Sequence, residues 1–139
     1  MDQTTKPSQT DNSRNSEKPV IIVTGSSGLI GSRVIKRLAP EYRIVGLDKE
    51  GAPHPPPEAD CMSFDITDAG SIRSTMERVR NQYGDKIVSI IHLAAYYDFS
   101  GEPSPLYEEV TVKGTEKFID ALHSFQVEQV CFFQYKSYL

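Results

Sequence analysis

The sequence predicts an α/β fold, a doubly wound parallel sheet of about five strands. Three observations predict it: short apolar runs alternate with helical patterns, a glycine-rich turn joins the first run to the first helix, and no repeat of solenoid period occurs. Repeated strand–helix units with right-handed crossovers build a parallel sheet with helices on both faces. With the glycine turn on the first strand, the expected strand order is 3-2-1-4-5, which is Rossmann-type.

The first strand is expected over Val20–Thr24, a pure β-branched run. A helix follows over Gly28–Ala39, where Pro40 ends it. The second strand is expected over Arg43–Leu47. Gly51–Pro57 contains four prolines, cannot be helical, and is expected to form an extended surface loop.

The third unit begins with a short strand over Asp60–Phe64. Thr67 and Asp68 are alternative caps for a helix that runs to about Tyr83, since each can accept a hydrogen bond from a free N–H of the first turn. Apolar residues recur on one face of this helix, as expected for a helix packed on a sheet.

The last elements are a buried strand over Ile87–Leu93, a long loop over Ala94–Pro103, a helix over Pro105–Phe125 and a strand over Gln129–Phe133. The Val- and Ile-rich composition of the first of these strands is typical of a strand buried on both faces. The carboxyl ends of the first and fourth strands diverge in this topology, so a ligand is expected there.

The length of 139 residues fits one domain, and the first 19 residues are polar enough to be expected to form a disordered tail. A net charge of −4 without a basic run argues against nucleic acid as a partner. No run approaches the ~18 apolar residues of a membrane span. Cys61 and Cys131 lack metal-type spacing and read as free thiols of a cytoplasmic protein, while His92, which ends an apolar strand, reads as structural. No metal ligands are predicted.

The turn Thr24–Gly31 is the most informative motif. A helix N-terminus presents free N–H groups and positive dipole potential to an anion. In such a site Gly25 makes the sharp turn out of the strand, Gly28 lets a diphosphate approach the backbone, and Gly31 lets the helix lie close to the strand. The position of the glycines between a strand and a helix makes a dinucleotide site a specific prediction.

Asp48 ends the second strand, 17 residues after Gly31. A carboxylate at about this spacing accepts hydrogen bonds from both ribose hydroxyls and repels a 2′-phosphate, so it favours NAD over NADP. Lys49 beside it weakens that preference. The alternative is that Asp48 is only a turn residue at the end of the strand.

The residues from about Val20 to Phe133 resemble the extended short-chain dehydrogenase/reductases, the NAD-dependent epimerase/dehydratase group. Four motifs carry the resemblance. They are Thr24-Gly25-x-x-Gly28-x-x-Gly31, Asp65-Ile66, His92-Leu93-Ala94-Ala95, and Tyr107-x-x-x-Thr111-Val112-x-Gly114-Thr115. The resemblance implies that Asp65-Ile66 contacts adenine and that Leu93, Ala94 and Ala95 lie near the nicotinamide half. The implied cofactor-binding residues are Gly25, Ser27, Gly28, Leu29, Ile30, Gly31, Asp48, Lys49, Asp65, Ile66, Leu93, Ala94, Ala95 and Thr111.

Each motif also has a plainer interpretation. Asp65 can instead cap the following helix, and Ala94 and Ala95 can instead be small core residues. Thr111 stands where the family has Asn, so a proton relay through that position is in doubt. Tyr96, Tyr97 and Phe99 fall in a loop that faces substrate in the family, where they either line a pocket or cover the end of the sheet. Gly114 costs a helix about 1 kcal/mol relative to Ala, which close packing against the neighbouring strand would explain.

The resemblance ends abruptly after Phe133. The family's Ser/Thr residues at the end of the fifth strand and its catalytic Tyr-x-x-x-Lys have no counterpart in Gln134–Leu139, so no catalytic residue is predicted and activity is uncertain. A truncated, frameshifted or processed product would each give this pattern. An incomplete fold would leave the fifth strand as an exposed apolar edge. The helix over Pro105–Phe125 would also lose a neighbour that, by the resemblance, often contributes to dimers in the family. A homodimer is considered.

Three functions follow as alternatives. The first is the NAD-binding part (residues 20–133) of an oxidoreductase, epimerase or dehydratase. Such an enzyme transfers hydride on a sugar nucleotide or small hydroxy or keto compound, and this part is expected to be inactive alone. Small-molecule substrate would bind only if a C-terminal part exists. The second is a non-catalytic dinucleotide-binding regulatory or interaction module, and the third is a fragment that does not fold stably.

Overall fold

The computed structural model describes residues 18–49, 54–95 and 105–132. The predicted polar tail up to residue 17, the start of the proline-rich loop and the loop with Tyr96, Tyr97 and Phe99 lie outside the described residues. So does the divergent end from residue 133 onward.

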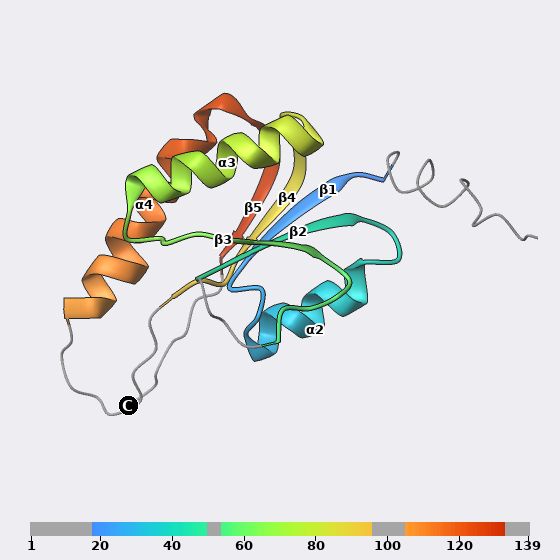
Figure 1. Ribbon diagram of the computed structural model, residues 1–139, viewed down its shortest axis with the longest axis horizontal. Coiled ribbons are helices and arrows are strands. Elements are labelled where there is room, and N and C mark those ends of the chain that lie inside the picture. Colours follow the sequence, from blue (N-terminus) through green and yellow to red (C-terminus); the bar gives the residue numbers. More distant parts are fainter. Residues whose placement is uncertain (1–17, 50–53, 96–104, 133–139) are drawn as a thin grey trace, which may run out of the picture.

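A five-stranded parallel sheet forms the centre of the molecule (Figure 1). Its order is β3-β2-β1-β4-β5, which confirms the predicted 3-2-1-4-5 topology. All four neighbouring pairs are parallel. The strands are β1 (Val20–Thr24), β2 (Arg43–Asp48), β3 (Asp60–Ser63), β4 (Lys86–His92) and β5 (Gln126–Phe132).

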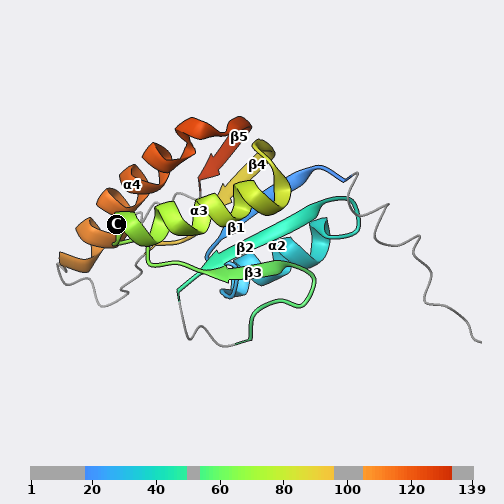
Figure 2. The same cartoon turned by 45° about the horizontal axis from the view of Figure 1, so that its top comes forward.

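Helices cover both faces of the sheet (Figures 1 and 2). Helix α2 (Leu29–Leu38) lies on one face, and α3 (Ala69–Tyr83) and α4 (Gly114–Ala121) lie on the other. The apolar core is divided accordingly: Ile35 of α2 packs with one side of β1 and β2, whereas the larger cluster includes Ile72 of α3 and Phe118 of α4. All five residues of β1 are buried, as a central strand between two helical layers requires.

The prediction of one continuous helix over Pro105–Phe125 is wrong, because the structure has three consecutive helical segments of different types there. The structure has a π-helix, η1 (Tyr107–Lys113), then α4, then a short 3₁₀ turn, η2 (Leu122–Ser124). The N–H of Gly114 bonds to the carbonyl of Glu109, five residues back rather than four. The run Val110-Thr111-Val112 offers a physical reason, because successive β-branched side chains crowd a regular α-helix.

Strand β5 begins three residues before the predicted Gln129, because the N–H of Gln126 bonds to the carbonyl of Asp85 at 2.7 Å and opens the ladder there. Within the described residues β5 pairs only with β4, so it is an edge strand. Val130 and Phe132 are 38% and 55% exposed on it, as the prediction of an exposed apolar edge expects. None of the helices in the described parts of the chain has the length and apolar content needed to span a membrane.

Candidate functional site

The glycine turn leaves β1 in a conformation that only glycine adopts easily at its first position. Gly25 has φ of +69°, and its N–H donates to the carbonyl of Leu47 at 2.8 Å. A Cβ atom at Gly25 would lie 3.0 to 3.1 Å from backbone atoms of Leu93 and Ala94. Gly25 is therefore required both by its backbone angle and by the close approach of the segment after β4.

Gly28 and Gly31 differ in how strongly their surroundings exclude a side chain. A Cβ at Gly31 would lie 2.3 Å from the carbonyl oxygen of Gly25, so Gly31 lets α2 start directly beneath its own turn. Gly28 is exposed, has an ordinary extended conformation, and its Cβ would meet only the Gly25 carbonyl, at 3.3 Å. The fold would therefore tolerate a small side chain at position 28. Gly28 lines the cavity at the N-terminus of α2.

Asp48 ties the glycine turn to the end of β2. Its Oδ2 accepts a hydrogen bond from the N–H of Ser27 at 2.9 Å, and its Oδ1 accepts one from the N–H of Lys49 at 2.8 Å. Asp48 is therefore also a turn residue at the end of β2, as the alternative interpretation of the sequence expects. An ionised carboxylate has about four lone-pair sites, so each oxygen of Asp48 keeps capacity for a further donor.

The loop between β3 and α3 is built around Asp65. Asp65 Oδ1 accepts hydrogen bonds from the N–H and the hydroxyl of Thr67, at 2.9 and 2.6 Å, and these bonds lower the pKa of this exposed carboxyl. The cap of α3 is Asp68, whose side chain accepts from the N–H groups of Gly70 and Ser71. The alternative that Asp65 caps the helix is therefore wrong.

A buried hydrogen-bond chain joins the carboxyl ends of β1 and β4. Thr24 Oγ1 accepts from the N–H groups of Leu93 and Ala94, both at 3.0 Å, which leaves its own proton for His92 Nδ1 at 2.7 Å. His92 Nε2 therefore carries the ring proton and donates it to Thr115 Oγ1 at 2.9 Å. Burial lowers the pKa of His92 to about 4. The interpretation of His92 as structural agrees with this neutral, doubly bonded ring.

These segments surround one cavity of about 470 Å³ at the carboxyl ends of the strands. Ten of the fourteen predicted residues line it: Gly25, Ser27, Gly28, Asp48, Lys49, Asp65, Ile66, Leu93, Ala94 and Ala95. Both alanines are partly buried at the cavity, and Ala94 also packs against the larger core cluster, so the core interpretation holds in part for Ala94.

The remaining four predicted residues do not line the cavity. Leu29 and Ile30 are exposed in the first turn of α2, and Gly31 is buried beneath the turn. Thr111 lies partly buried in η1.

Three lining residues were missed by the sequence interpretation. Phe64 and Thr67 flank the predicted Asp65-Ile66 pair and could have been found from that adjacency. Val110 reaches the cavity from η1, and no sequence signal marked it. Gly114 packs against Ile66 of the β3–α3 loop rather than against a strand, because a Cβ there would lie 2.9 Å from Ile66 Cγ1. The residues that the structure describes hold no group of three or more His, Cys, Asp or Glu able to bind a metal ion.

Comparison with known proteins identifies the family. The sequence model of the NAD-dependent epimerase/dehydratase family matches residues 21–134. The chain belongs to this family. The cavity between the glycine turn, Asp48, Asp65 and Leu93 is lined by named residues of three of the four motifs that carry the resemblance.

Relatives in the family are longer than this chain. The N-acetyl-alpha-D-glucosaminyl-diphospho-ditrans,octacis-undecaprenol 4-epimerase of Escherichia coli O157:H7 is 27% identical over 112 residues, which are 81% of this chain and 31% of that protein. The Bordetella bronchiseptica enzyme WbmG, solved with NAD, superposes with a TM-score of 0.66 at 21% identity over 85% of this chain and 38% of its own. Uronate dehydrogenase from Agrobacterium tumefaciens gives 0.64 at 20% identity over 83% and 40%. The two structures confirm the fold, and the chain spans about a third of the curated relative's length.

Proposed function

We propose that this chain is the NAD-binding portion of an enzyme that transfers hydride on a sugar nucleotide or on a small hydroxy or keto compound. The observation that carries the proposal is the convergence of ten predicted residues from four strand ends on one cavity. Family membership supports NAD as the cofactor. A sugar-diphosphate epimerase among its relatives, and a fold neighbour solved with both NAD and UDP, support the class of substrate.

The cavity residues fit NAD in a definite order along its length. The open N-terminus of α2 beside Gly28 suits the diphosphate, because free N–H groups and the helix dipole favour an anion there. Asp48 suits the adenosine ribose hydroxyls, and Asp65 with Ile66 suits adenine. Leu93, Ala94 and Ala95 then lie on the nicotinamide side. NAD supplies the site that accepts and returns hydride, and the residues of this chain hold and orient it.

Cofactor selectivity follows from Asp48. Its carboxylate, held by the N–H groups of Ser27 and Lys49, would lie against the 2′-position and repel a phosphate there. We therefore propose NAD rather than NADP as the cofactor. Asp48→Ala should reduce the preference for NAD, and an unchanged ratio of NAD to NADP affinity would place selectivity elsewhere.

Proton transfer is not assigned to this chain. The sequence contains no Tyr-x-x-x-Lys pair, the pair that performs acid–base work in the family. We propose that these 139 residues bind NAD and turn over no substrate alone. Measurable dehydrogenase or epimerase activity of the purified chain would refute this part of the proposal.

The test of the proposal is NAD binding by isothermal titration calorimetry with two matched variants. Gly28→Val places a branched side chain where the diphosphate would lie and should abolish binding. Ser74→Val makes a similar change on the exposed face of α3 and should leave binding unchanged. Thermal melts confirm that both variants are folded. Wild-type protein that does not bind NAD, or a Gly28→Val variant that binds it equally, would overturn the proposal.

A second candidate is a non-catalytic module that binds dinucleotide and regulates a protein partner. The exposed apolar edge at β5 favours it, since an unpaired edge strand is a template for association. Asp48→Arg should then release a co-purifying partner together with NAD. Absence of any stable partner in affinity purification would count against this candidate.

A further inference from the structure

We propose that Lys117 is a positioning residue that fixes the Asp65 carboxylate toward adenine, acting through Thr67. The proposal rests on the proposed function, because it assumes that adenine binds beside Asp65. Lys117 lies on α4, outside the residues that line the cavity, and the family motifs quoted above do not include it.

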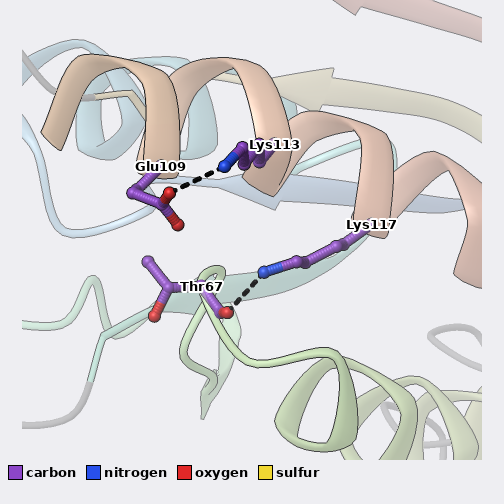
Figure 3. A network of polar contacts seen from close by, with 4 residues as sticks. All are labelled: Thr67, Glu109, Lys113 and Lys117. Atoms are coloured by element: carbon purple, nitrogen blue, oxygen red, sulfur yellow. Dashed lines mark hydrogen bonds and ion pairs between the residues drawn. The ribbon is translucent and has the colours of Figure 1, made fainter. Parts of the chain in front are cut away.

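The contact is a continuous path of hydrogen bonds from α4 to the cavity. Lys117 Nζ donates to the Thr67 carbonyl at 2.7 Å (Figure 3). Thr67 in turn donates to Asp65 Oδ1 through both its N–H and its hydroxyl. The position of the Thr67 backbone therefore decides where Oδ1 of Asp65 is held, and with it how the carboxylate is oriented at the cavity.

The Thr67 carbonyl is available to Lys117 because Thr67 precedes the N-cap residue of α3. The cap is Asp68, and its carbonyl accepts a helical hydrogen bond from the N–H of Ile72 at 3.1 Å. The Thr67 carbonyl therefore lies outside the helical ladder and needs a donor from elsewhere. Lys117 supplies a charged donor, which forms a stronger bond than a neutral one.

Packing brings α4 to this loop. Gly114 lies so close to Ile66 that a Cβ would be 2.9 Å from Ile66 Cγ1 and 3.2 Å from the Ile66 carbonyl oxygen. Lys117 is three residues after Gly114 and therefore lies on the same face of the helix. The close contact at Gly114 sets the distance over which the Lys117 side chain reaches Thr67.

Lys113 is a natural control on the same helical surface. Its Nζ pairs with Glu109 Oε1 at 3.0 Å, and both side chains are half exposed, so its ammonium group contacts Glu109 rather than Thr67 (Figure 3). Substituting Lys113 or Lys117 by Met removes the same charge from neighbouring turns. A difference between the two variants therefore reports the position of Lys117 beside Thr67 and Asp65 rather than the net charge of the protein.

The experiment compares NAD with its purine analogue, in which a hydrogen atom replaces the adenine amino group. The amino group can donate to Asp65, whereas the purine has no donor at that position, so wild-type protein should prefer NAD. Lys117→Met should reduce this preference about fivefold, the effect of about one net hydrogen bond. Lys117→Arg, which keeps the donor, should restore most of the preference, and Lys113→Met should retain all of it.

The outcomes separate the inference from the proposed function. Wild-type protein that fails to bind NAD refutes the proposed function. Wild-type protein that binds both dinucleotides equally, or a Lys117→Met variant with the wild-type preference, overturns the inference alone. Equal weakening of both ligands in Lys117→Met shows a purely structural role and also overturns it. As a second readout, NMR titration should show the pKa of Asp65 rising in Lys117→Met, because Thr67 and the Lys117 charge both lower it.

Discussion

His92 should make the stability of this protein depend on pH in a range where the carboxyl groups contribute little. Its ring is 6% exposed and neutral, with Nδ1 accepting from Thr24 and Nε2 donating to Thr115. A second ring proton would point Nδ1–H at a Thr24 hydroxyl that already accepts from two backbone N–H groups. Protonation therefore opposes both burial and the hydrogen-bond chain.

The magnitude follows from the two pKa values. Burial lowers the folded pKa to about 4 from the ordinary 6.5, so the unfolded chain binds the extra proton first as the pH falls. Stability is unaffected above about 6.5, decreases between 6.5 and 4, and changes no further through this group below 4. Linkage gives a loss of about 2 kcal/mol between pH 7 and pH 5. For a chain of 139 residues the melting temperature falls by about 3–4 °C for each kcal/mol.

Urea denaturation followed by circular dichroism at pH 7 and pH 5 measures this loss. His92→Asn removes the titrating ring and should give a nearly flat profile, at lower overall stability. His123→Asn, which changes an exposed histidine, should keep the wild-type pH dependence. Asp65 and Glu109 have lowered pKa values and so add to the loss only at still lower pH. A wild-type loss below about 0.5 kcal/mol, or an equal loss in His92→Asn, would refute the reasoning.

Three further substitutions test the packing around the site by thermal or urea denaturation. Gly31→Ala should destabilise by about 1–3 kcal/mol, because its Cβ would lie 2.3 Å from the Gly25 carbonyl oxygen, and a variant as stable as wild type would contradict the geometry of the turn. Phe118→Ala should cost about 3–5 kcal/mol, since the ring is fully buried against Phe64 and His92; a cost under 1 kcal/mol would mean that α4 is not packed as described. Asp68→Ala should cost about 1 kcal/mol by removing the cap of α3, and no cost would assign the cap elsewhere.

The parts of the fold that the sequence predicts well depend on local signals. The bounds of β1 match the prediction, because a β-branched run is followed at once by a glycine turn. Helix α2 is limited in the same local way, by the turn before it and by Pro40 after it. The strand order was predictable because right-handed crossovers leave few arrangements once the first turn is placed.

The parts that the sequence did not predict depend on contacts between distant residues. The bond from Thr24 to His92 joins residues 68 positions apart, and nothing in either local pattern indicates it. The early start of β5 follows from its bond to Asp85, and Val110 lines the cavity because η1 is packed beside segments that are distant in the sequence. The sequence gives no sign that Lys117 differs from a solvent-exposed helical lysine. Its role depends on the Thr67 carbonyl, which the fold brings within hydrogen-bond distance.

The hydrogen bonds at the floor of the cavity also restrict what the segment from Leu93 to Ala95 can offer a ligand. The N–H groups of Leu93 and Ala94 both donate to Thr24, so neither is available to a ligand. Gly25 brings the turn to within van der Waals contact of the same two residues, which leaves no space beneath them. Among the described residues, this side of the cavity therefore offers mainly the apolar side chains of Leu93, Ala94 and Ala95, whereas the charged side chains at the cavity are those of Asp48, Lys49 and Asp65. Under the proposed function, we expect polar contacts to hold the adenosine diphosphate half of NAD and shape to hold the nicotinamide half.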